Sequence, residues 1–265
     1  MRMKNLIAIL LTAVIFVAVA VLGVSTVYRV SAGTLEVSVV SDDARTEAST
    51  LEKQLSALYK KESIFSVTDG KAKEVFADYP YFRLTGLKKS YPNRLIFSAT
   101  EDPEVYAFEK EGKDGYYILG GDGTLLCERK TPENRRDKKA NGVVSGLKVS
   151  GALGDVPEGE DFATLLTFLS ALDRAFGGIR TSVVAANVSN PTSSPEYTNF
   201  LLTMREGVTV NVYNPASGTV QKAEALTAFY NGLSVSERLS GRIDVTDYLG
   251  ESGKYKVTYS LRGAE

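Results

Sequence analysis

The feature that most constrains this chain is a run of 24 positions, Asn5 to Tyr28, without a charged residue. A helix of that length reaches about 36 Å, which exceeds the ~30 Å hydrocarbon core of a bilayer. Because Arg2 and Lys4 precede the run, the positive-inside rule predicts a cytoplasmic tail over residues 1–4, a transmembrane helix over 5–28 and an extracytoplasmic remainder. The alternative is a signal peptide cleaved after the small residues Val30-Ser31-Ala32.

Composition limits what the outer part can do. Without the three basic residues Arg2, Lys4 and Arg29, 28 Lys and Arg face 32 Asp and Glu, so nothing suggests a nucleic-acid partner. The chain has no histidine, which removes the commonest general base and metal ligand. Cys127 is the single cysteine, so an intramolecular disulfide is impossible. We expect no metal and no cofactor, and we interpret Cys127 as a structural thiol.

The first outer region reads as strand, helix, helix, strand, strand. Apolar residues at helical spacing and period-two alternation define the five elements. Pro80 stops the second helix, and Ser90–Asn93 reads as a turn in which Pro fixes φ and Asn tolerates a left-handed conformation. The predicted elements are Leu35–Val39, Thr46–Tyr59, Asp69–Asp78, Tyr81–Lys89 and Arg94–Thr100.

The second outer region alternates strands with two helices. Gly120–Gly123 is predicted to form a tight turn rather than a phosphate-binding loop, and Gly177-Gly178 to end the first helix. Arg129–Gly142 is interpreted as a solvated basic loop, with attraction to anionic wall polymers or lipid headgroups as the alternative. One helix is predicted to begin at Asp161, and the other to span Thr219–Leu233. The predicted strands are Val105–Glu109, Tyr116–Leu119, Thr124–Cys127, Ile179–Val188, Asn199–Arg205, Val208–Tyr213, Gly241–Val245 and Lys254–Leu261.

This order of elements after one membrane anchor resembles a POTRA domain followed by the β-domain of the bacterial division proteins FtsQ and DivIB. The local match is Tyr91–Glu101, an aromatic-Pro turn and an alternating strand that ends at Glu; Lys222 at a helix start and Ile243-Asp244-Val245 add to it. The chain departs from the family at Glu101-Asp102-Pro103 and at Ser41-Asp42-Asp43. The fold class expected is α+β, with a POTRA domain (βααββ) over 29–103 and a β-domain with a largely antiparallel sheet over 104–265.

The resemblance implies a non-enzymatic scaffold that links early and late cell-division proteins at the septum. Its expected partners are FtsB/DivIC-like and FtsL-like bitopic proteins and, through them, the septal peptidoglycan synthase. It also implies a single-pass protein of the cell membrane with a cytoplasmic N-terminus.

Two alternatives come from other classes. Ser145-Gly146-Leu147-Lys148 matches the S-x-x-K of penicillin-interacting enzymes, which would make the chain a membrane-anchored extracytoplasmic Ser-Lys hydrolase. However, the strings nearest to the other two elements of those enzymes, Ser41–Asp43 and Lys130–Pro132, both precede the Ser–Lys pair, which is the wrong order. The third possibility is a POTRA-bearing secretion or export subunit.

The terminal strand is the predicted partner-binding site. Side chains alternate along it, and strands at a chain end often lie at a sheet edge, where unpaired backbone groups can accept a partner strand. The alternative is an edge kept unreactive by Lys254 and Lys256. The residues assigned to partner binding are Lys254, Tyr255, Lys256, Val257, Thr258, Tyr259 and Ser260.

Overall fold

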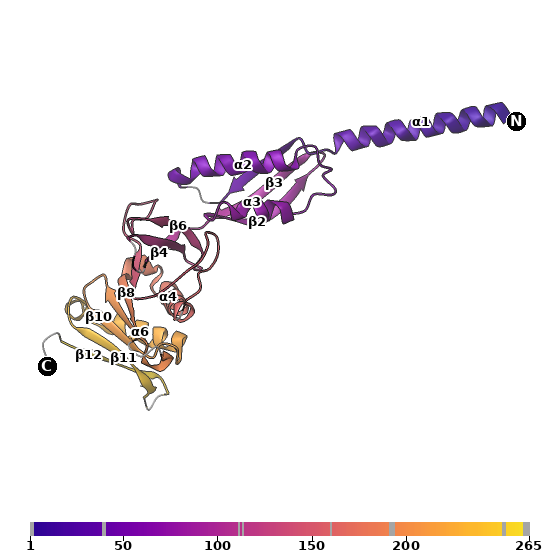
Figure 1. The fold of residues 1–265 in the computed structure, drawn as a ribbon. Coiled ribbons are helices and arrows are strands. Elements are labelled where there is room, and N and C mark those ends of the chain that lie inside the picture. The colour runs from indigo at the N-terminus through magenta and orange to yellow at the C-terminus, as the bar shows by residue number, and fades with distance from the viewer. Residues whose placement is uncertain are drawn as a thin grey trace. The chain divides into compact units, whose positions relative to one another are not determined.

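The computed structural model describes residues 3–38, 41–110, 112, 114–159, 161–190, 194–250 and 253–261 (Figure 1). The chain forms two compact units, Met1–Glu101 (unit 1) and Asp102–Glu265 (unit 2). The division lies two residues before the expected one. The architecture is mixed α+β with one apolar N-terminal helix, as the sequence predicts at that level.

Helix α1 (Met3–Val27) opens unit 1 and is long and apolar enough to cross a membrane. None of the residues Leu10–Val27 is buried in the structure. The helix begins inside the expected tail, of which residues 1 and 2 lie outside the described part of the chain. It ends one residue before the predicted limit at Tyr28.

The remainder of unit 1 has a three-stranded sheet with strand order β1-β3-β2 (Figure 1). Strand β1 pairs with β3 in parallel, and β2 pairs with β3 antiparallel. Strand β1 begins three residues earlier than predicted. Residue 39, the predicted end of this strand, and residue 40 lie outside the described residues. The elements are β1 (Ala32–Val37), η1 (Asp42–Ala44), α2 (Arg45–Tyr59), α3 (Gly70–Ala77), β2 (Phe82–Ser90) and β3 (Arg94–Glu101).

The core of unit 1 lies between α2 and one face of this sheet. Leu51, Leu55 and Tyr59 of α2 are buried and form one stripe along the helix, whereas Leu58 is half-exposed. The Tyr59 ring lies 5.6 Å from that of Phe97, and its hydroxyl donates to the Thr68 carbonyl at 2.8 Å. The buried Tyr59 side chain therefore has an apolar contact for its ring and a hydrogen-bond partner for its hydroxyl.

The β2–β3 hairpin buries one face of strand β3. Leu95, Phe97 and Ala99 are buried, whereas Ile96 and Ser98 are half-exposed. The turn contains a cis Tyr91–Pro92 bond, and Asn93 is not in the left-handed region.

Unit 2 is built on a nine-stranded sheet with order β12-β11-β10-β9-β8-β7-β4-β5-β6. Five neighbouring pairs are antiparallel and three, β4–β7, β7–β8 and β10–β11, are parallel. The strands are β4 (Glu104–Glu109), β5 (Tyr116–Gly120), β6 (Leu125–Arg129), β7 (Gly142–Ser145), β8 (Val183–Ser189), β9 (Asn199–Met204), β10 (Thr209–Tyr213), β11 (Arg242–Leu249) and β12 (Tyr255–Ser260).

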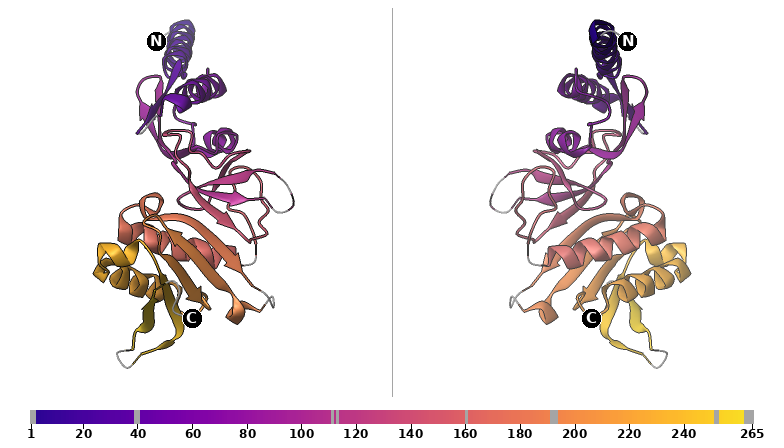
Figure 2. Two further views of the ribbon diagram at one scale, coloured as in Figure 1. Left: turned by 90° about the vertical axis from the view of Figure 1, so that its left-hand side faces the viewer. Right: turned by 90° about the vertical axis from the view of Figure 1, so that its right-hand side faces the viewer.

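Helices α4 (Phe162–Phe176) and α6 (Thr219–Gly232) lie side by side on one face of this sheet (Figure 2). The rings of Phe176 and Tyr230 meet edge-to-face at 5.5 Å, which joins the two helices. Strand β9 buries Phe200, Leu202 and Met204 beneath them. Leu201, which points to the other face, is 45% exposed, so the helices cover one face only.

The structure corrects four elements of unit 2. Ile179–Ser182, predicted as the start of a strand, forms the short helix α5, because Asp173 accepts a hydrogen bond from the Ile179 amide at 2.6 Å. Strand β7 and the short helix α7 (Val235–Arg238) were not predicted. Strand β11 extends four residues past its predicted end. The turn at Gly120–Gly123 is present and is closed by the Gly120 amide donating to Thr124 O at 2.9 Å.

Candidate protein-binding site at the sheet edge

Strand β12 forms one edge of the nine-stranded sheet, as the sequence predicts, and pairs only with β11 among the strands of the described chain. Every residue assigned to partner binding lies on it, except Lys254, which directly precedes it. Lys254, Lys256, Thr258 and Ser260 are exposed, and Tyr255, Val257 and Tyr259 are half-buried. Val257 and Tyr259 pack against the core beneath α6.

The backbone of β12 alternates between two directions. The carbonyl of Lys254 accepts from the Gly250 amide at 2.8 Å, and that of Lys256 accepts from the Thr246 hydroxyl at 3.0 Å. Even-numbered residues therefore aim their backbone groups at β11 and its turn. Since neighbouring residues of an antiparallel strand point opposite ways, Tyr255, Val257 and Tyr259 present their N–H and C=O groups to the open edge.

A buried lysine fixes the position of this edge. Lys222 lies in the first turn of α6 and its side chain is completely buried. Its ammonium donates three hydrogen bonds, to the carbonyls of Tyr213 and Asn214 at 2.7 and 2.6 Å and to a carboxylate oxygen of Asp247 at 2.7 Å. All three donors of the ammonium are therefore satisfied. One side chain thus joins α6, the end of β10 and the end of β11.

The same ammonium reaches β12. Lys222 Nζ lies 4.8 Å from the centre of the Tyr255 ring, a cation–π distance, and the Tyr255 hydroxyl lies 3.3 Å from that of Ser217. Gly218 is required at this contact, because its φ is +69° and a Cβ there would lie 2.2 Å from the Tyr255 hydroxyl. The first residue of the edge strand is thus seated directly against the start of α6.

Asp247 completes the charge balance around Lys222. Partial burial would raise the pKa of the Asp247 carboxyl, but the hydrogen bond from Lys222 and that from the Asn214 amide at 2.7 Å outweigh burial. The pKa is lowered, and the carboxylate stays ionised at neutral pH. An ion pair with this many hydrogen bonds is the form in which a buried ammonium is tolerated.

A groove of about 500 Å³ borders the edge strand. Ala225 and Ala228 of α6, Leu249 at the end of β11, and Lys254 and Tyr255 line it. Leu249 is 57% exposed, so the groove offers apolar surface beside the open backbone groups. A partner strand on the edge would have room there for its own apolar side chains.

Sequence reasoning named Lys222 only through the family resemblance and missed Asn214 and Asp247. A signal for Lys222 was available. It stands at i, with Leu226 at i+4 and Tyr230 at i+8, on the buried face of α6, where a charged residue has to find partners. Asp247 carried no such signal, because it lies beyond the predicted end of its strand.

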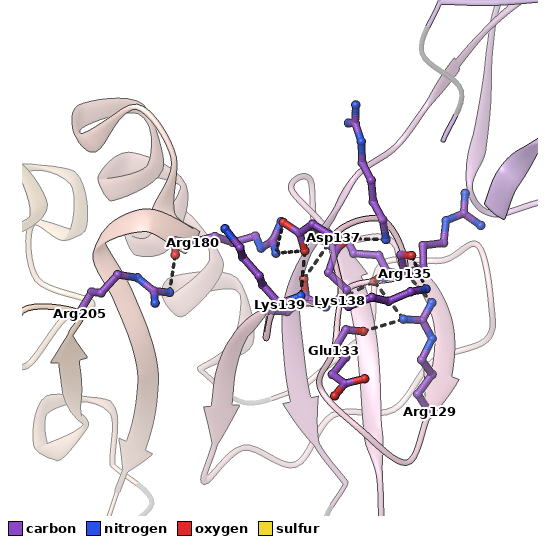
Figure 3. Close-up of polar contacts among 12 residues, drawn as sticks. Arg129, Glu133, Arg135, Asp137, Lys138, Lys139, Arg180 and Arg205 are labelled. Carbon is purple, nitrogen blue, oxygen red and sulfur yellow. Dashed lines mark hydrogen bonds and ion pairs between the residues drawn. The ribbon is translucent and has the colours of Figure 1, made fainter. Parts of the chain in front are cut away.

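The basic loop is more ordered than a solvated loop. The buried Glu104 carboxylate accepts from Arg129 and from the Arg135 amide at 2.8 Å, and buried Asn134 donates to the Glu104 and Asn141 oxygens at 3.0 Å each. Figure 3 shows the outer hydrogen bonds of the same loop. Arg180 donates to the Asp137 carboxylate at 2.9 Å, and Arg129 donates to the Glu133 carbonyl. Arg205 in turn donates to the Arg180 carbonyl. A polar core therefore holds the loop to the start of β4.

The residues of the Ser-Lys alternative lie on and after β7. The Ser145 hydroxyl accepts a hydrogen bond from the Asn187 side chain at 2.9 Å, and Lys148 is exposed. A serine activated by lysine needs its hydroxyl proton directed to an unprotonated, shielded amine, and an exposed lysine does not provide that environment. Cys127 on β6 was expected to be a buried structural thiol, but it is half-exposed. Among the described residues, no three His, Cys, Asp or Glu side chains gather as metal ligands.

No protein-family model matches this chain, and no curated protein is significantly similar to it.

Proposed function

We propose that this chain is a membrane-anchored, non-enzymatic scaffold of the bacterial division machinery, of the FtsQ/DivIB type. Helix α1 serves as the single membrane anchor, with the N-terminus in the cytoplasm and both units outside. Unit 1 acts as a POTRA domain and unit 2 as the partner-binding β-domain. The protein works by holding other division proteins together at the septum.

The observation that carries this proposal is the open edge of β12. Its outward N–H and C=O groups are a template for one more strand, and backbone pairing of this kind gives affinity without a catalytic group. The Lys222 contacts keep the template rigid, which lowers the ordering cost of binding. An FtsB/DivIC-like protein is the proposed source of the added strand, with an FtsL-like protein beside it and the septal peptidoglycan synthase reached through them.

Unit 1 supports the same assignment. Its order of strand, two helices and two strands is the order of elements that the resemblance implies for a POTRA domain. The Glu101 carboxylate at the end of the matched motif also ties β3 to the segment after β1, since it accepts from the Ser41 amide at 2.6 Å and from its hydroxyl at 2.7 Å.

A fluorescent fusion at the N-terminus tests this function. The fusion should gather at the division septum, and Val257→Pro should leave its level unchanged while later division proteins fail to join it. Val257→Ala is the control, because it also removes the valine methyl groups that pack on the core but keeps the amide. An even distribution over the envelope would contradict the division role and favour an export subunit. Loss of division on Ser145→Ala at unchanged abundance would favour the hydrolase.

A further inference from the structure

Three aromatic rings meet at the end of unit 1 where α1 stops. Tyr28 follows α1 directly, Phe65 lies in the loop after α2, and Tyr91 lies in the β2–β3 turn. Their ring centres are 5.0 Å (Tyr28–Phe65), 5.8 Å (Phe65–Tyr91) and 6.4 Å (Tyr28–Tyr91) apart. Phe65 and Tyr91 are each 59% exposed. We call these three rings the aromatic patch.

Backbone hydrogen bonds connect the patch closely to the end of α1. The Tyr28 carbonyl accepts from the Ile64 amide at 2.9 Å, beside Phe65, and the Ser31 amide donates to the Asn93 carbonyl at 2.9 Å, beside Tyr91. Between them, Val30 exchanges hydrogen bonds with the loop after α2, to Glu62 O at 2.8 Å and from the Lys61 amide at 3.0 Å. Residues 28–31 are thus part of the folded unit rather than a free linker.

The surroundings of the patch carry positive charge. Arg29, Lys60 and Lys61 are exposed. The nearby Glu62 is neutralised by Lys71 at 2.6 Å, and Lys89 holds the Phe65 loop by donating to the Phe65 carbonyl at 3.1 Å. Exposed lysines and arginines within a Debye length of a bilayer are attracted to anionic headgroups.

We propose that the aromatic patch binds the headgroup region of the membrane from which α1 emerges. This inference rests on the anchoring role proposed above for α1. Consecutive Cα atoms are about 3.8 Å apart, so Tyr28 enters the interface as soon as α1 leaves the hydrocarbon core. The hydrogen bonds described above then bring Phe65 and Tyr91 to the same depth. Tyrosine and phenylalanine with basic neighbours suit an environment that is apolar on one side and hydrated on the other.

The chain contains no tryptophan, so one introduced tryptophan reports without background. The experiment uses the full chain in phosphatidylglycerol-rich vesicles, with Phe65→Trp as the reporter and Ala77→Trp as the control. Ala77 is exposed at the end of α3. It shortly precedes β2, whose first residue, Phe82, pairs with Glu101 at the end of β3. Ala32, next to the aromatic patch, pairs with Arg94 at the opposite end of β3. Lipids brominated near the headgroup quench tryptophan on contact, and carbonate extraction reports anchoring independently.

The tryptophan of Phe65→Trp should emit at a shorter wavelength than that of Ala77→Trp. Brominated vesicles should reduce the emission of Phe65→Trp and leave that of Ala77→Trp unchanged. A carbonate-resistant chain whose Phe65→Trp emission is not quenched would overturn the membrane contact and leave the anchor standing. Blue-shifted but unquenched emission would mean that protein covers the patch, which also overturns the proposal. Equal quenching at both positions would show contact unrelated to the patch. Release of the chain by carbonate would overturn both the anchor and the inference.

Discussion

The two edges of the nine-stranded sheet differ in whether their outward backbone groups are hydrogen-bonded to another segment of the described chain. At the β6 edge, the Leu125 amide donates to the Asp155 carbonyl at 2.8 Å and the Leu125 carbonyl accepts from the Gly154 amide at 2.9 Å, so a loop of the same chain covers the edge at the first residue of β6. At the β12 edge, no segment of the described residues pairs with the outward groups of Val257 and Tyr259. The comparison shows that an edge can be covered in this fold and that β12 is left open.

The same contrast appears in what supports each edge. β6 is held by its own covering loop, whereas β12 is held from behind, by Lys222 and Tyr255 against the start of α6. Support from behind keeps the outward backbone groups available. We therefore interpret the β12 edge as a prepared binding surface and the β6 edge as a protected one.

Lys222→Met should give the largest effect, because it leaves the Tyr213 and Asn214 carbonyls without their donor and Asp247 without its ion-pair partner. We expect unit 2 to lose about 3 kcal/mol of unfolding free energy. Urea unfolding measures this, and the exposed Lys256→Met on β12 should stay within about 0.5 kcal/mol of the parent. Equal midpoints for the parent and Lys222→Met would show that the buried lysine does not hold the edge.

Thr258→Pro should be the next largest, since Thr258 aims its amide at β11. Proline removes that donor and leaves a carbonyl of β11 unpaired, which costs about 1–3 kcal/mol. Thr258→Ala, which keeps the amide, serves as the control because the side chain is exposed. If Thr258→Pro is as stable as Thr258→Ala, the inward and outward directions assigned along β12 are reversed.

Gly154→Pro should open the β6 edge by removing the amide that covers the Leu125 carbonyl. Gly154→Ala is the control for a Cβ at φ +87°, because it retains the amide, whereas the proline ring fixes φ near −65° and also forces the loop out of this conformation. We expect the proline variant to be less stable than the alanine variant by about 3 kcal/mol or more and to self-associate as concentration rises. Sedimentation at several concentrations measures this; identical behaviour of the two variants would mean that the loop does not protect the edge.

Acid should weaken the support of β12 slightly. The folded pKa of Asp247 is lowered, so its contribution to stability is complete above the unfolded pKa and is lost as pH falls through the folded pKa. Since the carboxylate is 39% exposed, the contribution should stay below about 1 kcal/mol. When pH is lowered from neutrality to below the folded pKa of Asp247, the unfolding free energy of Asp247→Asn should fall by less than that of the parent. Parallel stability curves would contradict the role given to Asp247.

The sequence predicted those parts of the fold whose signal is local and repeated. The apolar stripe of α4, with Gly177 at φ +68° at its end, and the alternation of β9 and β10 follow directly from periodicity. Strand β7 was missed because its four residues owe their strand conformation to the parallel neighbours β4 and β8, not to their own pattern. Short central strands of this kind depend on tertiary pairing.

The candidate site divides along the same line. The edge position of β12 was predicted from its place in the order of strands, and the sheet topology confirms it. Which of its residues face outward could not, since that depends on the register with β11 and the irregularity between Val245 and Leu249. The Lys222–Asp247 pair was also beyond sequence reasoning, because it joins residues 25 apart that come together only when β10, α6 and β11 are packed.

Amide hydrogen exchange along β12 tests the central claim most directly. In the free protein, the Val257 and Tyr259 amides should exchange quickly, and those of Thr258 and Ser260 should be protected by β11. Addition of the outer domain of an FtsB/DivIC-like partner should protect Val257 and Tyr259 and leave the even-numbered amides as they were. If Val257 and Tyr259 exchange at the same rate with and without the partner, while binding is seen by another method, the partner docks elsewhere and the β12 edge is not the site.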